Sequence, residues 1–275
     1  MSNQNDKALL FRSLHTASYV LALPNAWDVA SACVTEAAGA PAVATTSAGV
    51  AWSLGSADGD ELDRDRALDL IARVAAAVAV PVTADIESGF AATADGVAET
   101  IRGVLAAGAV GINLEDALHR GDTPLRPIAD QCERIAAARE AADATGIPLY
   151  INARVDNFLR AVGDPATRLQ DALERAVAYI AAGADGIFVP GVVDSATVAA
   201  LVEGVSVPLN VLAGPGAMSV AEFGKLGVAR VSLGSSVASA AYAVAQRAAV
   251  ELFSTGTYES VEGGLGFGEL NDLVK

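Results

Sequence analysis

Short apolar runs rich in Val and Ile recur along the chain, and each is followed by a longer segment with the spacing of an amphipathic helix. Flat apolar runs of this kind are typical of parallel strands that are buried on both faces. Eight of them occur, at residues 20–23, 42–45, 82–85, 111–115, 149–153, 186–189, 209–212 and 230–233. The clearest helical segments between them are 64–79, 97–107, 130–145, 165–182 and 195–203. Eight strand–helix units in 275 residues predict an α/β fold, a closed (β/α)8 TIM barrel.

The alternative architecture is an open, doubly wound sheet. That fold usually carries a glycine-rich phosphate-binding turn after its first strand. Here the first apolar run is followed by Leu23-Pro-Asn-Ala-Trp27, which has no glycine. We therefore favour one barrel domain spanning residues 1–275, in which about 251–275 form an extra C-terminal helix and tail.

Composition excludes several classes of partner. Acidic residues outnumber basic ones by 33 to 18, and the formal net charge of −15 disfavours binding to nucleic acid or to an anionic membrane. The sequence contains no uninterrupted apolar run long enough to cross a bilayer. The two cysteines, Cys33 and Cys132, have no zinc-site spacing, and the polar N-terminus does not resemble a secretory signal. The expected compartment is the cytoplasm.

Acidic residues gather at the ends of two consecutive predicted strands. Asp85 and Glu87 follow the third apolar run, and Glu115 ends the fourth. The C-terminal ends of barrel strands form the active-site face, so these carboxylates are expected to meet there. Oxygen ligands without a neighbouring His or Cys suit Mg²⁺, with Mn²⁺ as a substitute. The alternative is that they are loop carboxylates or helix caps that face the solvent.

Arg154 and a stretch of small residues are candidates for binding an anion. Arg154 follows the fifth strand, where a guanidinium can hold a carboxylate through two hydrogen bonds or can balance the acids. Ser47, Ala48 and Gly49 follow the second strand, and their small side chains let backbone N–H groups approach a carboxylate or an oxyanion. Small turn residues are also common without any function.

The remaining polar and aromatic residues near strand ends give weaker indications. Trp27 is expected to wall the pocket or simply to pack, and Asn210 lies at the seventh strand. His119, in the loop after the fourth strand, is a candidate for catalysis or gating, whereas His15 in the first helix is expected to be structural. None of the lysines (Lys7, Lys225 and Lys275) follows a strand, which disfavours a Schiff-base mechanism.

Seven segments together resemble the isocitrate lyase/phosphoenolpyruvate mutase superfamily, in its phosphonomutase-like branch. They are Pro24-Asn-Ala-Trp-Asp28, Thr45-Thr-Ser-Ala-Gly49, Leu54-Gly-Ser-Ala-Asp-Gly59, Pro81-Val-Thr-Ala-Asp-Ile-Glu-Ser-Gly89, Gly108-Ala-Val-Gly-Ile-Asn-Leu-Glu-Asp116, Ile151-Asn-Ala-Arg-Val-Asp156 and Ala184-Asp-Gly-Ile-Phe-Val-Pro190. They occur in order across most of the chain. The resemblance implies a barrel whose last helix is swapped between the subunits of a homodimer or homotetramer.

The resemblance also implies roles for individual residues. Asp85 would bind Mg²⁺ directly, and Glu87 and Glu115 would act through metal-bound water. The substrate carboxylate would lie on the segment Ser47-Ala-Gly49, and Arg154 would hold the substrate. Asp58 matches the active-site aspartate of the superfamily.

The loop after the fourth strand departs from the superfamily pattern. Isocitrate-type lyases carry Lys-Lys-Cys-Gly-His there and phosphonate mutases a Lys-Thr-Asn-Ser type, whereas this chain has Ala117-Leu-His-Arg-Gly-Asp-Thr-Pro-Leu-Arg126. The shared half-reaction remains: stabilisation by Mg²⁺ of a pyruvate-like enolate. We therefore expect a lyase that cleaves a C–C bond of, or decarboxylates, a small anionic 2-oxo or 2-hydroxy dicarboxylate. His119, or a water near Asp58, is the candidate proton donor.

Two other functions remain open from the sequence. One is P–C chemistry in the same site, of the phosphoenolpyruvate mutase or phosphonopyruvate hydrolase type. The other is a barrel that binds a ligand without turnover.

Overall fold

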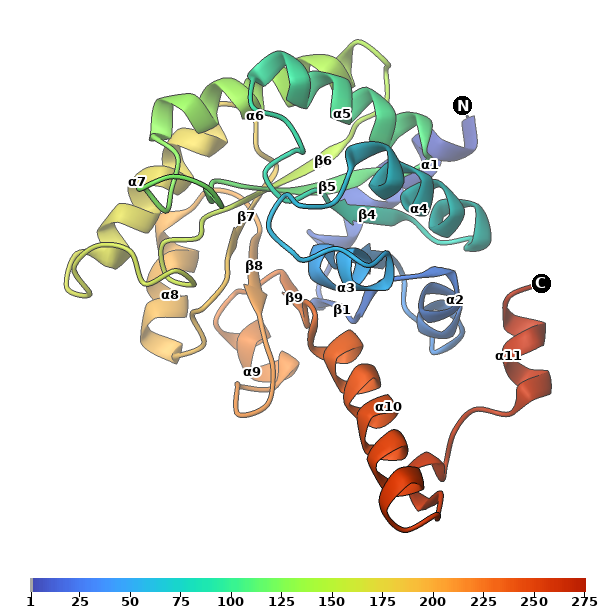
Figure 1. The fold of residues 1–275 in the computed structure, drawn as a ribbon. Helices are drawn as coiled ribbons and strands as arrows, with labels where there is room; N and C mark the ends of the chain where they lie inside the picture. Colours follow the sequence, from blue (N-terminus) through green and yellow to red (C-terminus); the bar gives the residue numbers. More distant parts are fainter. Residues whose placement is uncertain (1) are drawn as a thin grey trace.

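A computed structural model describes residues 2–275, and its centre is a nine-stranded parallel barrel surrounded by helices (Figure 1). The strands lie in the order β1-β9-β8-β7-β6-β5-β4-β3-β2. Their bounds are β1 Leu21–Leu23, β2 Asn25–Ala26, β3 Val43–Thr45, β4 Val82–Asp85, β5 Gly111–Glu115, β6 Tyr150–Arg154, β7 Gly186–Val189, β8 Leu209–Leu212 and β9 Arg230–Ser232. The predicted (β/α)8 TIM barrel is confirmed, and every predicted apolar run coincides with a strand.

The ninth strand arises because the first predicted strand is split at Pro24. β1 pairs with β9, and β2, two residues further along, pairs with β3. A proline has no backbone N–H to give to a ladder, so it falls between the two short strands rather than inside one. The chain itself therefore joins the first and last strands of the sheet.

Helices follow the strands as the sequence predicts. Their bounds are α1 Ser2–Leu14, α2 Val29–Ala37, α3 Ser47–Ser53, α4 Arg64–Ala77, α5 Ala94–Ala106, α6 Ile128–Asp143, α7 Arg168–Ala181, α8 Ser195–Gly204 and α9 Val220–Lys225. Side chains fix several starts: Asp63, Thr93 and Asp194 each accept a hydrogen bond from a backbone N–H in the first turn of their helix. At the other end, Gly108 and Gly183 have φ of 94° and 112°, a conformation that glycine adopts without strain.

The floor of the barrel is aromatic. Phe11 of α1 is fully buried and meets the Tyr150 ring edge-on at 5.6 Å. His15 lies directly after α1 rather than inside it, is 5% exposed, and stacks on Tyr150 with the ring centroids 3.9 Å apart. The prediction that His15 is structural agrees with this position, which lies at the opposite end of β6 from Arg154.

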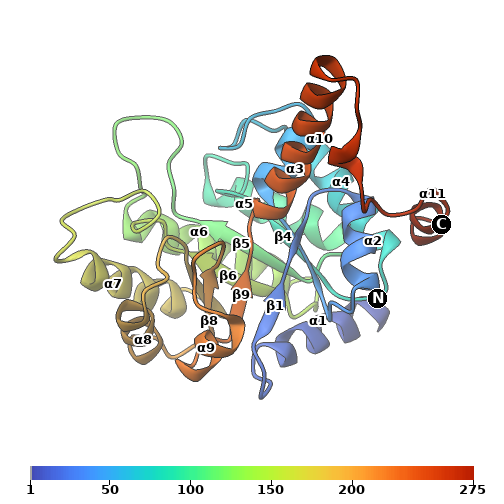
Figure 2. The same cartoon turned by 90° about the horizontal axis from the view of Figure 1, so that it is seen from below.

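The C-terminal segment starts earlier than predicted. Instead of a helix beginning near residue 251, α10 runs from Ser236 to Ser254, and η1 (Glu259–Val261) and α11 (Phe267–Leu273) follow. We call residues 236–275 the arm. Within the arm, α10 projects from the barrel and buries only Ala238, whereas α11 returns to lie beside α2 (Figures 1 and 2). Between residues 2 and 275, no helix has the length and apolar character needed to span a bilayer.

Candidate active site

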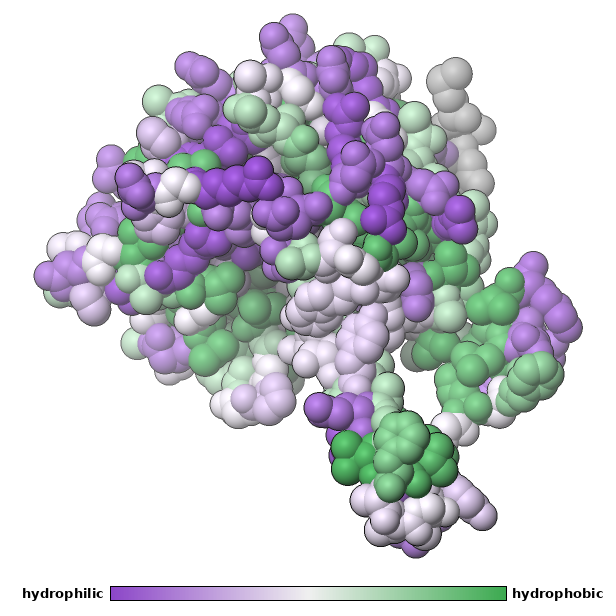
Figure 3. All heavy atoms as spheres, viewed as in Figure 1, coloured by the Kyte–Doolittle hydropathy of each residue, from purple (hydrophilic) through white to green (hydrophobic). Residues whose placement is uncertain are grey.

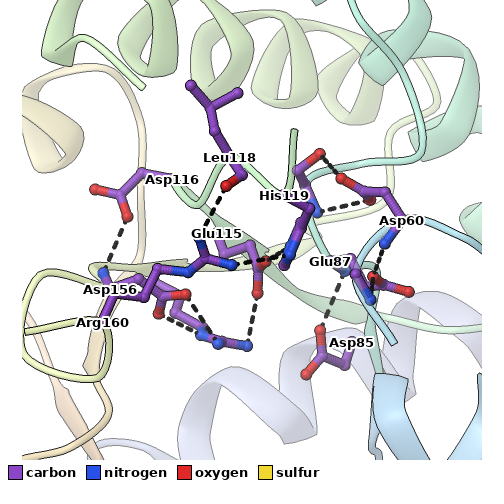
Figure 4. A network of polar contacts seen from close by, with 12 residues as sticks. Asp60, Asp85, Glu87, Glu115, Asp116, Leu118, His119, Asp156 and Arg160 are labelled. Atoms are coloured by element: carbon purple, nitrogen blue, oxygen red, sulfur yellow. Dashed lines mark hydrogen bonds and ion pairs between the residues drawn. The ribbon is translucent and has the colours of Figure 1, made fainter. Parts of the chain in front are cut away.

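Three neighbouring strands bring the strongest candidate residues together. Asp85 ends β4, Glu115 ends β5 and Arg154 ends β6. Because the strands are parallel, their last residues lie on the same face of the barrel, and Glu115 is the register partner of Arg154. Figure 4 shows these acids around a single region, with Glu87 just beyond Asp85. The predicted convergence of β4, β5 and β6 side chains is therefore present in the structure.

Glu115 is held from two sides. Its Oε2 lies 2.6 Å from Nη1 of Arg154, and its Oε1 lies 2.6 Å from Nε2 of His119. Burial raises the pKa of Glu115. The Arg154 charge and the His119 hydrogen bond together lower it by more than burial raises it, so the net pKa is below its usual value. Glu115 is therefore the carboxylate of this group whose charged form is favoured most by its surroundings.

Arg154 joins the acids of two strand ends. Besides Glu115, it makes two parallel hydrogen bonds to Asp156, with Nε–Oδ1 at 2.6 Å and Nη2–Oδ2 at 2.9 Å. Its side chain is only 14% exposed. A planar guanidinium with five donors can hold both carboxylates and still present an N–H group to a ligand.

Glu87 and Asp85 have no basic partner, unlike Glu115. Glu87 Oε2 accepts hydrogen bonds from the amides of Gly59 (2.9 Å) and Asp60, while its Oε1 is buried with no partner. Burial raises the pKa of Glu87 to about 8 and that of Asp85 to about 6. The backbone at Glu87 has φ of 50°, which is uncommon for a residue with a side chain. Both carboxyl groups thus lie in surroundings that disfavour their charge.

A divalent cation would fit this arrangement, although the three acids do not converge on one point. Among residues 2–275, no three Asp, Glu, His or Cys side chains are grouped closely enough to hold a metal by themselves. Mg²⁺, however, usually keeps several waters and takes few direct protein ligands. The unpartnered Glu87 oxygen and the partly buried Asp85 carboxyl group are oxygen donors of the kind that such an ion binds. The metal site stays a prediction.

A loop between β5 and α6 crosses the site, and we call its residues 117–126 the lid. An antiparallel bridge joins Ala117 to Leu125 within it, and His119 reaches back to Glu115. Arg120, in the lid, pairs with Glu61 in the loop before α4, with Nη2–Oε1 at 2.9 Å. A hollow of about 800 Å³ lies beside the lid and includes His119 and Asp60 in its wall. The role of His119 in catalysis or gating stays a prediction.

The small residues after β3 lie at the start of a helix. Ser47, Ala48 and Gly49 form the first turn of α3, where backbone N–H groups have no partner within the helix. All three are buried. A Cβ on Gly49 would come within 2.8 Å of both Trp27 and Thr46, so only glycine fits there. This crowding explains the small residues, and the amides remain available to a carboxylate.

The other predicted residues lie around this group or below it. Asp58 is at the mouth, where desolvation raises its pKa and the Ser47 side chain lowers it, with Glu115, Arg154 and His119 close enough to act on it. Trp27 packs against Gly49 and lines a shallow surface hollow beside Val237 of α10, not the acid group. Asn210 is buried inside the barrel, where its Nδ2 donates to Ser232 Oγ at 3.2 Å. The roles of Trp27 and Asn210 in substrate binding therefore stay predictions.

Sequence reasoning missed two residues of this region. Asp60 accepts a hydrogen bond from the Ser88 hydroxyl and donates its amide to Glu87, so it ties two loops together. Arg160, in the loop between β6 and α7, contacts the lid. Both residues lie within long loops, where neither hydrophobic periodicity nor a position at the end of a strand identifies a functional residue.

Residues 11–253 match the sequence profile of the family described as phosphoenolpyruvate phosphomutase. The chain belongs to this family. The family lies within the isocitrate lyase/phosphoenolpyruvate mutase superfamily that the sequence motifs predicted, and its members include lyases and mutases.

Three similarities illustrate the range of the superfamily. A solved structure from Burkholderia cenocepacia J2315 is 42% identical, covers 99% of this chain and 96% of its own, and has a TM-score of 0.92. The 2-methylisocitrate lyase of Escherichia coli K12 is 30% identical over 72% of this chain and 67% of the lyase. A phosphonopyruvate hydrolase solved with oxalate and Mg²⁺ is 26% identical, covers 97% of this chain and 94% of its own, and has a TM-score of 0.84.

Proposed function

We propose that this family member is a Mg²⁺-dependent lyase that cleaves a C–C bond of, or decarboxylates, a small 2-oxo or 2-hydroxy dicarboxylate. The reaction would pass through a pyruvate-like enolate. The observation that carries the proposal is the placement of Asp85, Glu87 and Glu115 at adjacent strand ends beside Arg154, with Glu87 and Glu115 buried and Asp85 partly buried. Relatives that act on 2-methylisocitrate, and a neighbour that binds oxalate with Mg²⁺, support the class of substrate.

Asp85 would hold the cation directly, and Glu87 and Glu115 would do so through bound water, with Mn²⁺ able to replace Mg²⁺. When bound, the cation supplies positive charge that stabilises the negative charge of the enolate. It would also remove the need for Asp85 and Glu87 to take up protons, because a nearby positive charge favours their charged form.

The chain's own residues would bind and orient the substrate. The amides of Ser47, Ala48 and Gly49 are suited to one carboxylate, because the first turn of a helix presents unpaired N–H groups. Arg154 would hold the distal or departing carboxylate with the N–H group that its ion pairs leave free. Asp58 at the mouth and His119 in the lid are the groups that would move a proton. With the lid closed, water would be kept from the enolate.

P–C chemistry on a phosphonate is the second candidate. The family description and the similarity to phosphonopyruvate hydrolase favour it. The lid carries neither the Lys-Lys-Cys-Gly-His pattern of the isocitrate-type lyases nor the Lys-Thr-Asn-Ser type of the phosphonate mutases, so it favours neither chemistry.

A substrate screen with Mg²⁺ tests the proposal and separates the two candidates. Oxaloacetate, 2-methylisocitrate-like acids and phosphonopyruvate are compared by the release of pyruvate and phosphate and, for phosphonopyruvate, also by its conversion into phosphoenolpyruvate. We expect turnover of a carboxylic acid, abolished by EDTA and restored by Mg²⁺. Asp85→Asn is expected to lower kcat by about 100-fold or more, and Glu99→Gln, an exposed acid on α5, serves as the matched control. Turnover that EDTA does not affect would contradict the metal site, and no turnover of any acid would leave the non-catalytic barrel.

We also propose that the chain forms a homodimer or homotetramer in which the arm is exchanged between subunits. Large apolar side chains are exposed on it, including Phe253 (86%), Tyr258 (76%) and Phe267 (87%). Figure 3 shows apolar side chains gathered at the far end of α10 and around α11. Exposed apolar surface of this kind usually marks an association site. Sedimentation velocity measures the oligomeric state, and a monomer at micromolar concentration would contradict the exchange.

A further inference from the structure

Arg160 reaches across from the loop after β6 to the underside of the lid. Its Nη1 donates to the carbonyl oxygens of Leu118 (2.8 Å) and Pro124 (3.3 Å), and its Nη2 lies 3.0 Å from Nδ1 of His119. These three partners come from both halves of the lid, and Figure 4 shows the guanidinium between Leu118 and His119. The backbone of Arg160 is anchored in turn, because its N–H donates to the Asp156 carbonyl at 2.9 Å.

The contact with His119 fixes the tautomer of that ring. An arginine side chain has donors only, so Nδ1 of His119 must accept the hydrogen bond through its lone pair. In a neutral imidazole the other nitrogen then carries the hydrogen, and Nε2–H donates to Glu115 at 2.6 Å. Both ring nitrogens are thereby satisfied, and the ring is oriented toward the end of β5.

The other histidine of the chain is predicted to be the opposite tautomer. Nδ1 of His15 lies 2.8 Å from the carbonyl oxygen of Phe11, which can only accept a hydrogen bond. Nδ1 of His15 therefore carries the hydrogen, and its Nε2 is buried without a partner. The chain contains only two histidines, so His15 is an internal reference for His119.

Other contacts hold the lid less directly. The Arg120–Glu61 pair lies at its outer edge, with the two side chains 74% and 52% exposed, and exposed pairs of this kind contribute little. The amide of Arg126 donates to the Asp116 carbonyl at 2.8 Å, which anchors the end of the lid but not its tip. Arg160 differs because its one partly buried side chain contacts both halves of the lid and His119.

We propose that Arg160 is a positioning residue that holds the lid closed and sets His119 as the Nε2–H tautomer facing Glu115. This goes beyond the proposed function, because neither role depends on which reaction the site performs. The Glu115 carboxylate also selects Nε2–H, because it can only accept a hydrogen bond. Loss of the guanidinium would release the lid, carry His119 away from Glu115 and leave Nδ1 without its donor, so that the ring would exchange between tautomers.

Imidazole ¹⁵N NMR of the full-length protein without substrate tests the tautomer. At mildly alkaline pH, wild type is expected to show one ring of each tautomer, with His119 identified by its loss in His119→Asn. In Arg160→Met the His119 nitrogens should move to a mixture while His15 stays unchanged. Arg160→Lys, which keeps one donor group, should restore the wild-type pattern in part. An Nδ1–H ring at His119 in wild type, or unchanged shifts in Arg160→Met, would overturn the proposal.

Limited trypsin digestion tests the lid, because the Arg120–Gly121 bond lies within it. The appearance of the fragment that begins at Gly121 is followed by mass spectrometry. Arg160→Met is expected to speed this cleavage by about tenfold, as removal of several hydrogen bonds favours local opening. Arg64→Met, which removes an exposed arginine whose ion pairs lie outside the lid, is the control and should leave the rate unchanged. Equal rates for the two variants would show that Arg160 does not hold the lid.

These two readouts are separate from the reaction. If the substrate screen fails but the tautomer and the cleavage rate respond to Arg160→Met, only the proposed function falls. Once a substrate is known, Arg160→Met is expected to lower kcat more than it raises KM, because the substrate carboxylates are held by other residues.

Discussion

The barrel mouth and the arm are incomplete in opposite ways. At the mouth, the Asp85 and Glu87 carboxyl groups have no basic partner and have raised pKa values, whereas Glu115 is paired with Arg154 and His119. On the arm, Phe253 and Phe267 are large apolar side chains that lack a cover. Burying an unpaired charge and exposing a large apolar side chain are both unfavourable, so each region indicates what completes it. The partners that we propose are a small cation at the mouth and a second protein chain at the arm.

The largest effect is expected at the paired centre of the mouth. Arg154→Met leaves the carboxylates of Glu115 and Asp156 buried without a counter-charge, which should reduce the free energy of unfolding by about 3–5 kcal/mol. Urea denaturation measures it. The double variant Glu115→Gln/Arg154→Met should recover part of the lost stability, because one of the two unpaired buried carboxylates has been removed. A loss below about 1 kcal/mol would mean that solvent reaches these acids freely.

The arm should respond to a charge placed on its apolar side chains. Phe253→Glu is expected to weaken self-association by about 2–4 kcal/mol, the range for a central apolar residue of an interface. Sedimentation equilibrium gives the dissociation constant. Tyr19→Glu is the matched control, because Tyr19 is also exposed (57%) but lies in the turn between α1 and β1. Equal effects of the two substitutions would show that the arm has no special role.

The pH dependence of stability should reveal the unpaired acids. Asp85 and Glu87 have raised pKa values of about 6 and about 8 in the folded protein, so their stabilising contribution is complete below their unfolded values and is lost as pH rises through 6 and then 8. Without metal, we expect Tm to fall by roughly 5 °C between pH 5.5 and 8.5. Mg²⁺ should cancel most of this fall, and an identical fall with and without Mg²⁺ would contradict binding at these acids. Differential scanning calorimetry measures it.

The smallest effect is expected at the rim of the mouth. Glu61→Gln removes the exposed ion pair with Arg120, which should change the free energy of unfolding by less than about 0.5 kcal/mol. Chemical denaturation with wild type in parallel is sufficient to detect a larger change. A loss above about 1 kcal/mol would show that the loops of the mouth are coupled more strongly than their exposure suggests.

The strands and the placement of the acids were predictable, because both depend on local pattern and on one property of barrels. Buried parallel strands leave flat apolar runs, and residues at their ends must share a face, so Asp85, Glu115 and Arg154 could be placed together from the sequence. The contacts of Arg160 and Asp60 could not, since the course of a loop is set by tertiary packing and leaves no periodic signal.

The start of α10 was missed for a different reason. Residues Ser236–Ser254 are rich in alanine, carry few charges and bury only Ala238 against their own barrel. A helix that does not pack along its own domain has no need of an apolar stripe opposite a charged one, which is the pattern that marks the other helices. The same lack of pattern is consistent with a helix that packs against more than one surface.

The break at Pro24 places a seam in the ring of strands, between β1 and β2. Elsewhere around the barrel, neighbouring strands are joined by ladders of hydrogen bonds, but β1 and β2 are joined end to end by the peptide chain itself. A circular permutation that placed new termini at this point would cut the covalent link across the seam. The Asn25 side chain, which accepts hydrogen bonds from the amides of Leu233 and Gly234, would then hold β2 beside the end of β9. The same operation in the surface loop between α8 and β8 would leave the ring intact.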